Sequence, residues 1–208
     1  RRLGPSFRHP SGFVFDRNGV LYGQVNRVFA DEFDACSSSG LYDELMADRL
    51  LVPHASADVA LALTTDAYAV LEPERLPFIS YPYEWCFGQL KDAALLTLAV
   101  QSRALERGFV LRDASAYNVQ FVDGRPVFMD TLSFERYRDG EPWIAYKQFC
   151  QHFLVPLMLM ARRDIRFGLL LREYLDGIPL DFGSEMLPRR SWADIRALLH
   201  IHMHARAQ

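Results

Sequence analysis

The spacing of apolar residues in the first part of the chain changes from a strand-like to a helix-like pattern. Residues 13–15 and 20–22 are β-prone, and the Asn18-Gly19 pair between them predicts a hairpin. Over residues 27–50 the apolar positions recur on helical faces and are interrupted by a Ser-Ser-Ser-Gly run. The pattern therefore predicts two strands followed by two helices with a turn between them.

Two further β-prone runs follow, at residues 67–71 and 78–81. The segment between them contains two prolines, which have no N–H to donate and so forbid a continuous strand. Residues 90–105 carry leucine and alanine at three- and four-residue intervals, and Gly108 follows, which predicts a long amphipathic helix. Residues 1–85 are thus expected to form a small α+β unit.

The rest of the chain is predicted to be mainly helical. Residues 119–122 and 126–129 are short apolar runs joined by an Asp-Gly pair, which predicts a second hairpin. Three longer runs have helical periodicity, at residues 143–161, 167–175 and 192–203. The expected fold class is α+β, with a reduced N-terminal unit and a mainly helical unit over residues 86–208.

Composition restricts the class of protein. With 208 residues, half of them apolar, and a formal net charge of -3, the chain can bury a substantial core. The longest apolar run, residues 153–161, is bounded by His152 and a charged cluster, so no membrane span is expected. The near-neutral charge without a basic run argues against a nucleic-acid partner.

The N-terminal residues and the three cysteines indicate the cellular compartment of the protein. The first residues lack Met and an apolar signal region, so we expect a missing true start and a cytoplasmic protein. Cys36, Cys86 and Cys150 are odd in number and far apart. This spacing favours reduced thiols used in packing over disulfides or a zinc site.

The most informative segment is residues 109–135. Residues 111–118 match the kinase catalytic-loop pattern H-R-D-x-x-x-x-N at Arg112, Asp113 and Asn118, with leucine in place of the histidine. After a predicted strand pair, Asp130 stands where kinases have the Asp of D-F-G.

Over residues 13–160 the chain therefore resembles the protein-kinase-like superfamily, and within it aminoglycoside phosphotransferases and choline kinases. The resemblance implies a two-lobed fold in which Asp113 orients an acceptor hydroxyl and Asn118 and Asp130 bind Mg²⁺ beside ATP. It also places Arg112 at the cofactor. The alternative is that these polar residues only cap turns.

Aromatic residues before the long helix are a second group of candidates. Tyr83 and Trp85 are predicted either to line the cofactor site or to form a hydrophobic wall where the two lobes meet.

Two patterns imitate functional sites. Asp181-Phe182-Gly183 spells the kinase triplet but lies beyond two predicted helices, so we expect a loop between helices. His200 and His204 share a helix face at metal-ligand spacing without an acidic third ligand, which favours a solvated or partner-facing helix end.

The phosphate-binding half of a kinase site is not evident. The glycines of the first hairpin do not form G-x-G-x-x-G, and no lysine precedes Lys91. Arg17 or Arg27 could supply the positive charge, although a guanidinium does not simply replace an ammonium. Glu32 and Glu44 are candidates for the helix acid that normally pairs with the lysine.

A second resemblance spans nearly the whole chain. Residues 10–14, 78–85 and 148–153 are similar to the front part of bacterial class I SAM-dependent methyltransferase proteins, some of them grouped with nodulation proteins. Those proteins carry a Rossmann-like domain after this region, whereas the present residues show no Gly-rich turn for SAM. The resemblance implies a leading fragment with a downstream methyltransferase domain.

Three functions stay open at this point. The first is a kinase-fold accessory or ligand-binding module with weak or absent phosphoryl transfer, whose partner is a small molecule or a downstream methyltransferase domain. The second is an active phosphotransferase that uses Mg²⁺ and ATP. The third is a methyltransferase whose SAM domain lies beyond residue 208.

Overall fold

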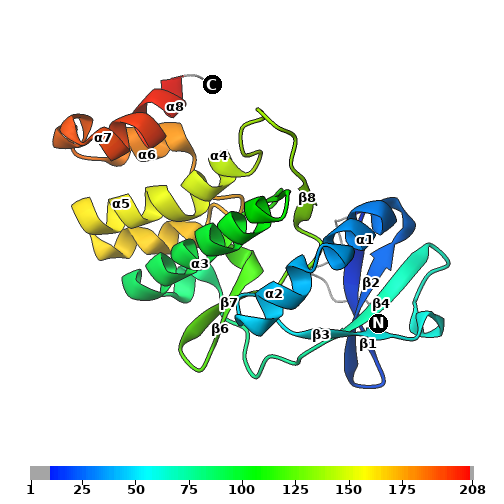
Figure 1. Cartoon of the computed structure of the whole chain (residues 1–208). Helices are drawn as coiled ribbons and strands as arrows, with labels where there is room; N and C mark the ends of the chain where they lie inside the picture. The colour runs from blue at the N-terminus through cyan, green and yellow to red at the C-terminus, as the bar shows by residue number, and fades with distance from the viewer. Residues whose placement is uncertain (1–9, 207–208) are drawn as a thin grey trace.

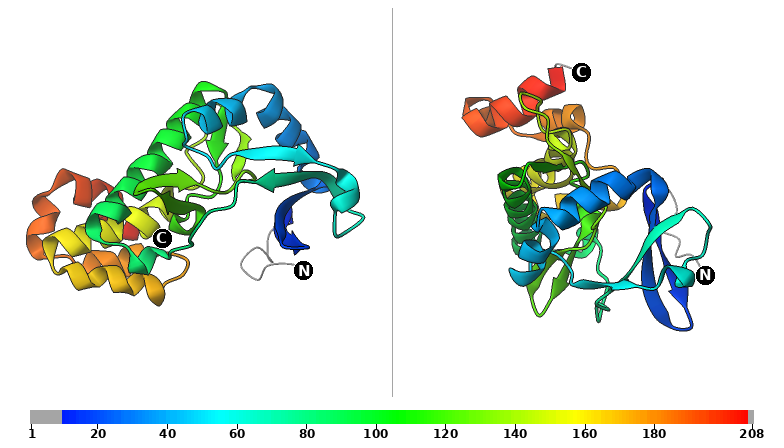
Figure 2. Two further views of the ribbon diagram at one scale, coloured as in Figure 1. Left: turned by 90° about the horizontal axis from the view of Figure 1, so that it is seen from below. Right: turned by 45° about the vertical axis from the view of Figure 1, so that its right-hand side comes forward.

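The protein is an α+β molecule with a sheet at one end and a group of short helices at the other. The computed structural model describes residues 10–206. The N-terminal sheet and the C-terminal helices lie far apart, with helix α3 (Phe87–Glu106) and four short strands between them (Figures 1 and 2). The α+β prediction is therefore confirmed.

The N-terminal sheet has four antiparallel strands in the order β1-β2-β4-β3. These are β1 (Gly12–Arg17), β2 (Val20–Asn26), β3 (His54–Ala57) and β4 (Ala67–Pro73). The predicted first hairpin is confirmed, because Asn18 and Gly19 both have positive φ angles, of 57° and 83°, as a tight two-residue turn requires.

Each face of this sheet is covered by apolar side chains. One cluster contains Phe13, Phe15 and Val70, and a second contains Val25, Phe29 and Leu71. Neighbouring residues of β4 thus belong to opposite faces, as the two-residue period of a strand dictates. The second cluster matters for the site because it also contacts the segment that follows Asp130.

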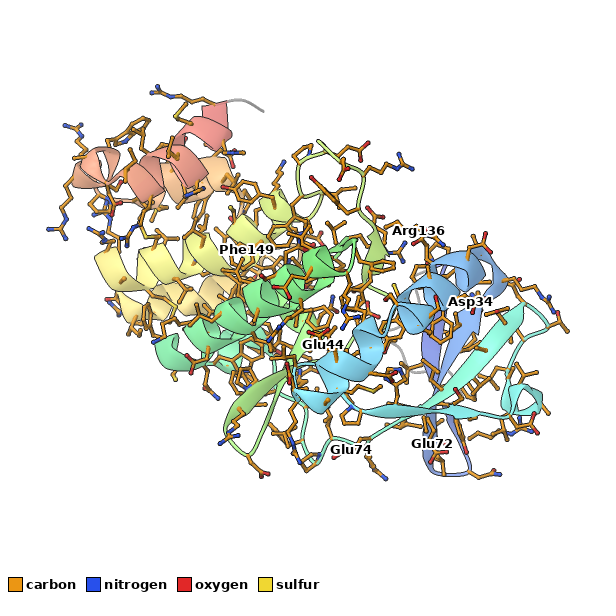
Figure 3. The ribbon with its side chains drawn as sticks, viewed as in Figure 1. Asp34, Glu44, Glu72, Glu74, Arg136 and Phe149 are labelled. Atoms are coloured by element: carbon orange, nitrogen blue, oxygen red, sulfur yellow. The ribbon has the colours of Figure 1, made fainter. Side chains whose placement is uncertain are left out.

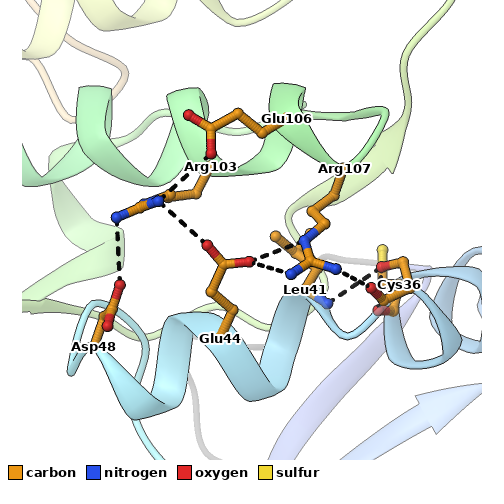
Figure 4. Close-up of polar contacts among 8 residues, drawn as sticks. Cys36, Leu41, Glu44, Asp48, Arg103, Glu106 and Arg107 are labelled. Atoms are coloured by element: carbon orange, nitrogen blue, oxygen red, sulfur yellow. Dashed lines mark hydrogen bonds and ion pairs between the residues drawn. The ribbon is translucent and has the colours of Figure 1, made fainter.

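The two predicted helices after β2 are confirmed as α1 (Ala30–Ser38) and α2 (Leu41–Ala47). Gly40 joins them at a φ of 76°, a left-handed conformation that favours glycine. Helix α2 lies beside α3, and Figure 4 shows Arg103 of α3 and Arg107, just after its end, reaching Glu44 of α2.

Four short strands surround the candidate catalytic segment. They are β5 (Phe109–Leu111), β6 (Val119–Val122), β7 (Arg125–Phe128) and β8 (Phe134–Arg136). Strands β6 and β7 form the predicted second hairpin, with Asp123 and Gly124 at positive φ. Strands β5 and β8 pair antiparallel, a pairing that the sequence did not predict.

The predicted helical character of the C-terminal part is right in kind, but the helices are short and of mixed type. The α-helices are α4 (Tyr146–Phe149), α5 (Val155–Arg162), α6 (Leu180–Met186), α7 (Ile195–Ala197) and α8 (Met203–Arg206). Residues Cys150–Leu154 and Leu198–His202 are π-helical, and Ile165–Arg172 is a 3₁₀-helix.

The prediction of a strand at residues 78–81 is wrong. Ser80 instead bonds to the buried Gln120 side chain, donating its N–H to Oε1 (2.8 Å) and accepting from Nε2 (2.8 Å). A side chain thus takes the place of a neighbouring strand, which an apolar pattern cannot reveal.

The prediction of a loop at residues 181–183 is also wrong, because these residues lie in α6. A Cβ added at Gly183 would lie 2.5 Å from Val155 Cγ1, so this glycine lets α6 approach α5 closely.

One apolar cluster runs from Cys36 on α1 to Ile201 near the C-terminal end. Cys36 and Cys150 are buried free thiols, whereas Cys86 is exposed, so the packing assignment is wrong for Cys86. Within residues 10–206, no helix combines the length and the apolar character needed to cross a bilayer.

Candidate functional site

Two backbone hydrogen bonds tie the catalytic-loop-like segment to the segment around Asp130. The N–H of Arg112 donates to Ser133 O (2.8 Å), and the N–H of Met129 donates to Asn118 O (2.7 Å). The loop that begins at β5 and the turn that follows β7 therefore run side by side, with Asp113 and Asp130 each one residue away from a bonded position.

Only one oxygen of the Asp113 carboxylate accepts hydrogen bonds from the described residues. Its Oδ1 accepts hydrogen bonds from the Ser115 N–H (2.9 Å) and from Gln148 Nε2 (2.9 Å). The other end of the Gln148 amide accepts from the Ala114 N–H (2.7 Å), so this glutamine clamps both the side chain and the backbone of the loop. Asp113 Oδ2 accepts no hydrogen bond from residues 10–206 and remains available as an acceptor.

Asp130 differs, because its own turn uses both of its oxygens. Oδ1 accepts from the Leu132 N–H (2.9 Å) and Oδ2 from the Ser133 hydroxyl (2.5 Å). Asn118 Nδ2 donates to the same hydroxyl at 3.4 Å. Asn118 and Asp130 thus both contact the Ser133 hydroxyl.

The Arg112 side chain connects the start of β1 with the turn that follows Asp130. Its Nε donates to Leu132 O (3.2 Å), a terminal nitrogen donates to Ser11 Oγ (2.8 Å), and the guanidinium carbon lies 4.9 Å from the centre of the Phe29 ring. The side chain therefore joins the start of β1 to the Asp130 turn, and its observed contacts are structural.

Tyr83 and Trp85, the aromatic candidates from the sequence, both pack against other side chains. Trp85 is 5% exposed and donates its indole N–H to Ser80 Oγ (2.8 Å). Tyr83 stacks on Tyr81 with ring centres 5.5 Å apart. Burial raises the pKa of Tyr117, and the nearby phenols of Tyr83 and Tyr81 raise it further. The aromatic cluster therefore reaches the loop that carries Asp113.

His152 is a buried neighbour of the site that sequence reasoning did not select. It is 1% exposed, its Nδ1 has no hydrogen-bond partner, and its ring meets that of Tyr117 edge-on at 6.2 Å. Burial lowers the pKa of His152 to about 4, against the opposing effect of the Asp113 and Asp176 carboxylates. The sequence offered two signals for His152: its place in the segment of residues 148–153, and its position four residues after Gln148, about one helical turn away.

Arg17, one of the candidate substitutes for the lysine, is directed away from the site. Arg17 donates to Leu61 O (2.7 Å) and Ala60 O (3.3 Å), and no cation among residues 13–80 is paired with Asn118 or Asp130. The expected lysine substitute is thus not found in the described part of the chain.

Both candidate helix acids are paired with arginines of other elements. Glu32 bonds Arg136 at 2.7 Å, and Figure 3 shows Arg136 beside α1. Glu44 pairs with Arg107 at 2.7 Å and with Arg103 at 3.4 Å (Figure 4). These pairs join α1 to β8 and α2 to α3, which is a structural use of both acids.

The donor set fits Mg²⁺ and ATP poorly. Mg²⁺ prefers several oxygen ligands with octahedral geometry, but the oxygens of Asp130 are already hydrogen-bonded and Asn118 offers one carbonyl. Among residues 10–206 there is no group of three His, Cys, Asp or Glu side chains that could hold a metal. His200, on the other metal-like motif, is hydrogen-bonded through Nδ1 to the Tyr146 hydroxyl.

Two hollows on the described surface lie away from this site. One, of about 560 Å³, is formed by the β1–β2 turn, β3 and the end of β4. The other, of about 480 Å³, lies between Tyr146 and the helix that carries His200 and Met203. Neither is lined by Asp113, Asn118 or Asp130.

The fold and the site together define an α+β protein with a polar loop cluster of two carboxylates and one amide. No protein-family model matches the chain. It is 40% identical over 209 residues to the nodulation protein NoeA of Rhizobium meliloti (strain 1021), in an alignment that covers 100% of this chain and 44% of that protein. The chain thus spans less than half the length of this relative.

Proposed function

We propose that this chain is a kinase-fold accessory module that binds a small-molecule ligand or a partner domain between two lobes, with weak or absent phosphoryl transfer. The N-terminal lobe would be the four-stranded sheet with α1 and α2, and the second lobe the remainder. The order of helix, loop, hairpin and Asp130 turn supports this proposal.

The connection after β2 supports the loss of phosphoryl transfer. In kinases the ATP-binding lysine lies on the third strand, before the helix that carries its glutamate. Here β2 leads through a single 3₁₀ turn, Arg27–Phe29, directly into α1. The strand that immediately precedes this helix, β2, carries no lysine.

The observation that carries the proposal is the difference between the two aspartates. Asp113 has one oxygen fixed and one free to accept a hydrogen bond, whereas both oxygens of Asp130 are engaged in its turn. A metal at Asp130 would share oxygens that each already accept a hydrogen bond, whereas a ligand could use the Asp113 oxygen that accepts none. This favours ligand binding over catalysis.

The relative supports a role within a longer protein. NoeA is named a nodulation protein and is more than twice as long as the matched region. In this proposal the chain corresponds to the leading part of a methyltransferase-type protein, and its partner is the domain that follows. Methyl transfer itself would then belong to a SAM domain beyond residue 208.

The test is a titration of the protein with ATP and Mg²⁺ by calorimetry, combined with mass spectrometry of a panel of hydroxyl-bearing acceptors. The wild type should form no more phosphorylated product than Asp113→Ala or Asp130→Ala. Product that is formed by the wild type and abolished by Asp113→Ala would overturn the proposal.

The same result would favour a second candidate, an active small-molecule phosphotransferase. The specific observation in its favour is the free Oδ2 of Asp113, because a carboxylate in this state can orient an attacking hydroxyl. Its weakness is that no cation of residues 13–80, the described part of the first lobe after its first turn, is paired with Asp130.

A further inference from the structure

One face of the C-terminal helical segment exposes a row of large apolar side chains. Ile195, Leu199 and Met203 follow one another at four-residue intervals along α7, the π-helical turn and α8, and they are 66%, 44% and 53% exposed. Residues four apart lie on one face of a helix, so these side chains form a single row, which we call the C-terminal stripe. A helix normally buries such a stripe against another element.

A hollow of about 480 Å³ lies beside the stripe, at the end of the molecule away from the N-terminal sheet (Figure 1). Leu199 and Met203 line it together with Tyr146, His200 and His204. The Tyr146 hydroxyl is hydrogen-bonded to His200 Nδ1, and the ring centres of Tyr146 and His204 are 5.3 Å apart, so the opposite wall is held in place. A fixed hollow beside exposed apolar groups can receive a side chain from another protein.

The elements that carry and adjoin the stripe are basic. Residues 187–206 contain four arginines, no lysine and one acidic residue, Asp194, which is bonded to Arg162. None of the four arginines forms an ion pair with residues 10–206. They are Arg189, Arg190, Arg196 and Arg206. Positive charge is thus left uncompensated here, in a chain with a net charge of -3.

The composition of this surface favours a protein partner. Arginine, methionine and aromatic residues are enriched in interfaces between proteins, whereas lysine is depleted. The surface has this composition, with Met203, Tyr146, Trp192 and arginine without lysine. A lipid surface would also attract the arginines, but it has no side chain to fill the hollow. The partner that fits is an apolar protein surface bordered by acidic side chains.

We propose that the C-terminal stripe is the docking surface for the domain that follows this region in a longer protein. This inference rests on the proposed function, in which that domain is the partner. NoeA is more than twice as long as the region it shares with this chain, and the stripe lies on the last helices of that region. A domain that follows is tethered beside the stripe, and a short tether raises the effective concentration of its partner surface.

The oxidation of Met203 reports on whether the stripe is covered, because Met203 is the one methionine among residues 10–206 that is exposed. The experiment treats the 208-residue chain and the full-length protein with dilute hydrogen peroxide and follows each methionine sulfoxide by peptide mass spectrometry. Met203 should be oxidised at least about tenfold more slowly in the full-length protein. The buried Met160 is the internal reference, and it should stay slow in both.

Two variants of the full-length protein should restore the fast oxidation of Met203. Leu199→Glu places a carboxylate in the apolar contact, and Arg196→Glu brings like charges together at its border. The matched control is Leu95→Glu, because Leu95 is a 57% exposed leucine on α3, outside the stripe. Met203 should remain protected in this control. Circular dichroism establishes that each variant is folded.

The inference is overturned by equal oxidation of Met203 in the two wild-type proteins, by protection that persists in Leu199→Glu or Arg196→Glu, or by an equal loss of protection in Leu95→Glu. Two other occupants would also overturn it. A dimer of the 208-residue chain in sedimentation velocity, dispersed by Leu199→Glu, would identify a second copy, and co-sedimentation with phosphatidylcholine–phosphatidylserine vesicles, abolished by the same change, would identify a lipid surface.

Failure of the proposed function has a different signature. Phosphorylated product from the wild type would defeat that proposal without altering the oxidation of Met203. An unprotected Met203 would defeat the docking surface alone.

Discussion

Buried amide side chains replace backbone partners at several points of this protein. Gln24 is fully buried, and its Oε1 accepts the N–H groups of Leu63 (3.0 Å) and Thr64 (3.3 Å). Gln120 accepts the N–H of Ser80 in the same way, and the buried Gln101 accepts that of Leu111. A buried amide side chain has no water to bond with, so it must find hydrogen-bond partners within the protein. The backbone groups that supply these partners are thereby held in one position.

His152 makes a testable contribution to the pH dependence of stability. Its folded pKa of about 4 lies below the ordinary value of 6.5, so between these values the unfolded chain binds more protons than the native protein. The stabilisation is therefore complete above pH 6.5 and is lost as the pH falls toward 4. The loss is about 3 kcal/mol for a shift of this size.

The measurement is urea unfolding of the wild type and His152→Leu at several pH values. The variant cannot take up this proton, so its free energy of unfolding should fall less steeply on acidification. His204→Gln, at an exposed position, is the control and should follow the wild type. An unchanged slope in His152→Leu would contradict the assignment.

At the scale of elements, the long helix and both hairpins were predictable because their signals are local. Asn-Gly and Asp-Gly pairs select tight turns through the positive φ that each position requires, and the leucine spacing of α3 marks one buried face. Strand β3 has the sequence His-Ala-Ser-Ala, which lacks the alternation of apolar and polar residues that predicts a strand. It is extended because it pairs with β4, a contact between distant segments that a local pattern does not reveal.

The contact between α2 and α3 should be sensitive to charge. Glu44 accepts two hydrogen-bonded contacts from Arg107 and lies 3.4 Å from Arg103. Glu44→Gln should lower the free energy of unfolding by about 1 kcal/mol at low salt, and less at about 1 M salt, because these side chains are partly exposed.

Glu141→Gln is the matched control for this pair. Its partner Arg138 lies 3.8 Å away, and the two side chains are 60% and 82% exposed. Chemical denaturation should show almost no effect of this change. A cost for Glu44→Gln that is no larger than that of the control would show that the α2–α3 ion pairs do not contribute to stability.

In the whole molecule, one apolar core contains residues from both sides of the boundary that the sequence predicts near residue 85. Leu41, Leu45 and Leu51 are fully buried and belong to the same cluster as Phe128 and Phe134. Helices α1 and α2 are thus packed on the part of the chain that follows them, even though they are connected in sequence to the sheet.

A fragment of residues 86–208 should therefore fail to fold cooperatively. It would expose the surface of α3 and β7 that α2 and Leu51 cover in the intact chain, and burial of such side chains is worth about 1.5–3 kcal/mol each. Differential scanning calorimetry of the fragment should show no sharp transition. The intact chain, measured under the same conditions, should show one, and an equally sharp transition in the fragment would contradict this.

The two hairpins, the helical pair after β2, the long helix and the order of Asp113, Asn118 and Asp130 were all readable from the amino-acid sequence. Turn preferences, helix periodicity and residue spacing act over a few neighbouring residues. Three properties became visible only in the folded molecule: both oxygens of Asp130 accept hydrogen bonds within its own turn, Gln148 donates to Asp113, and Leu132 packs against the start of β1. These properties depend on side chains brought together from distant segments, whose hydrogen-bond partners and free volume no local pattern records.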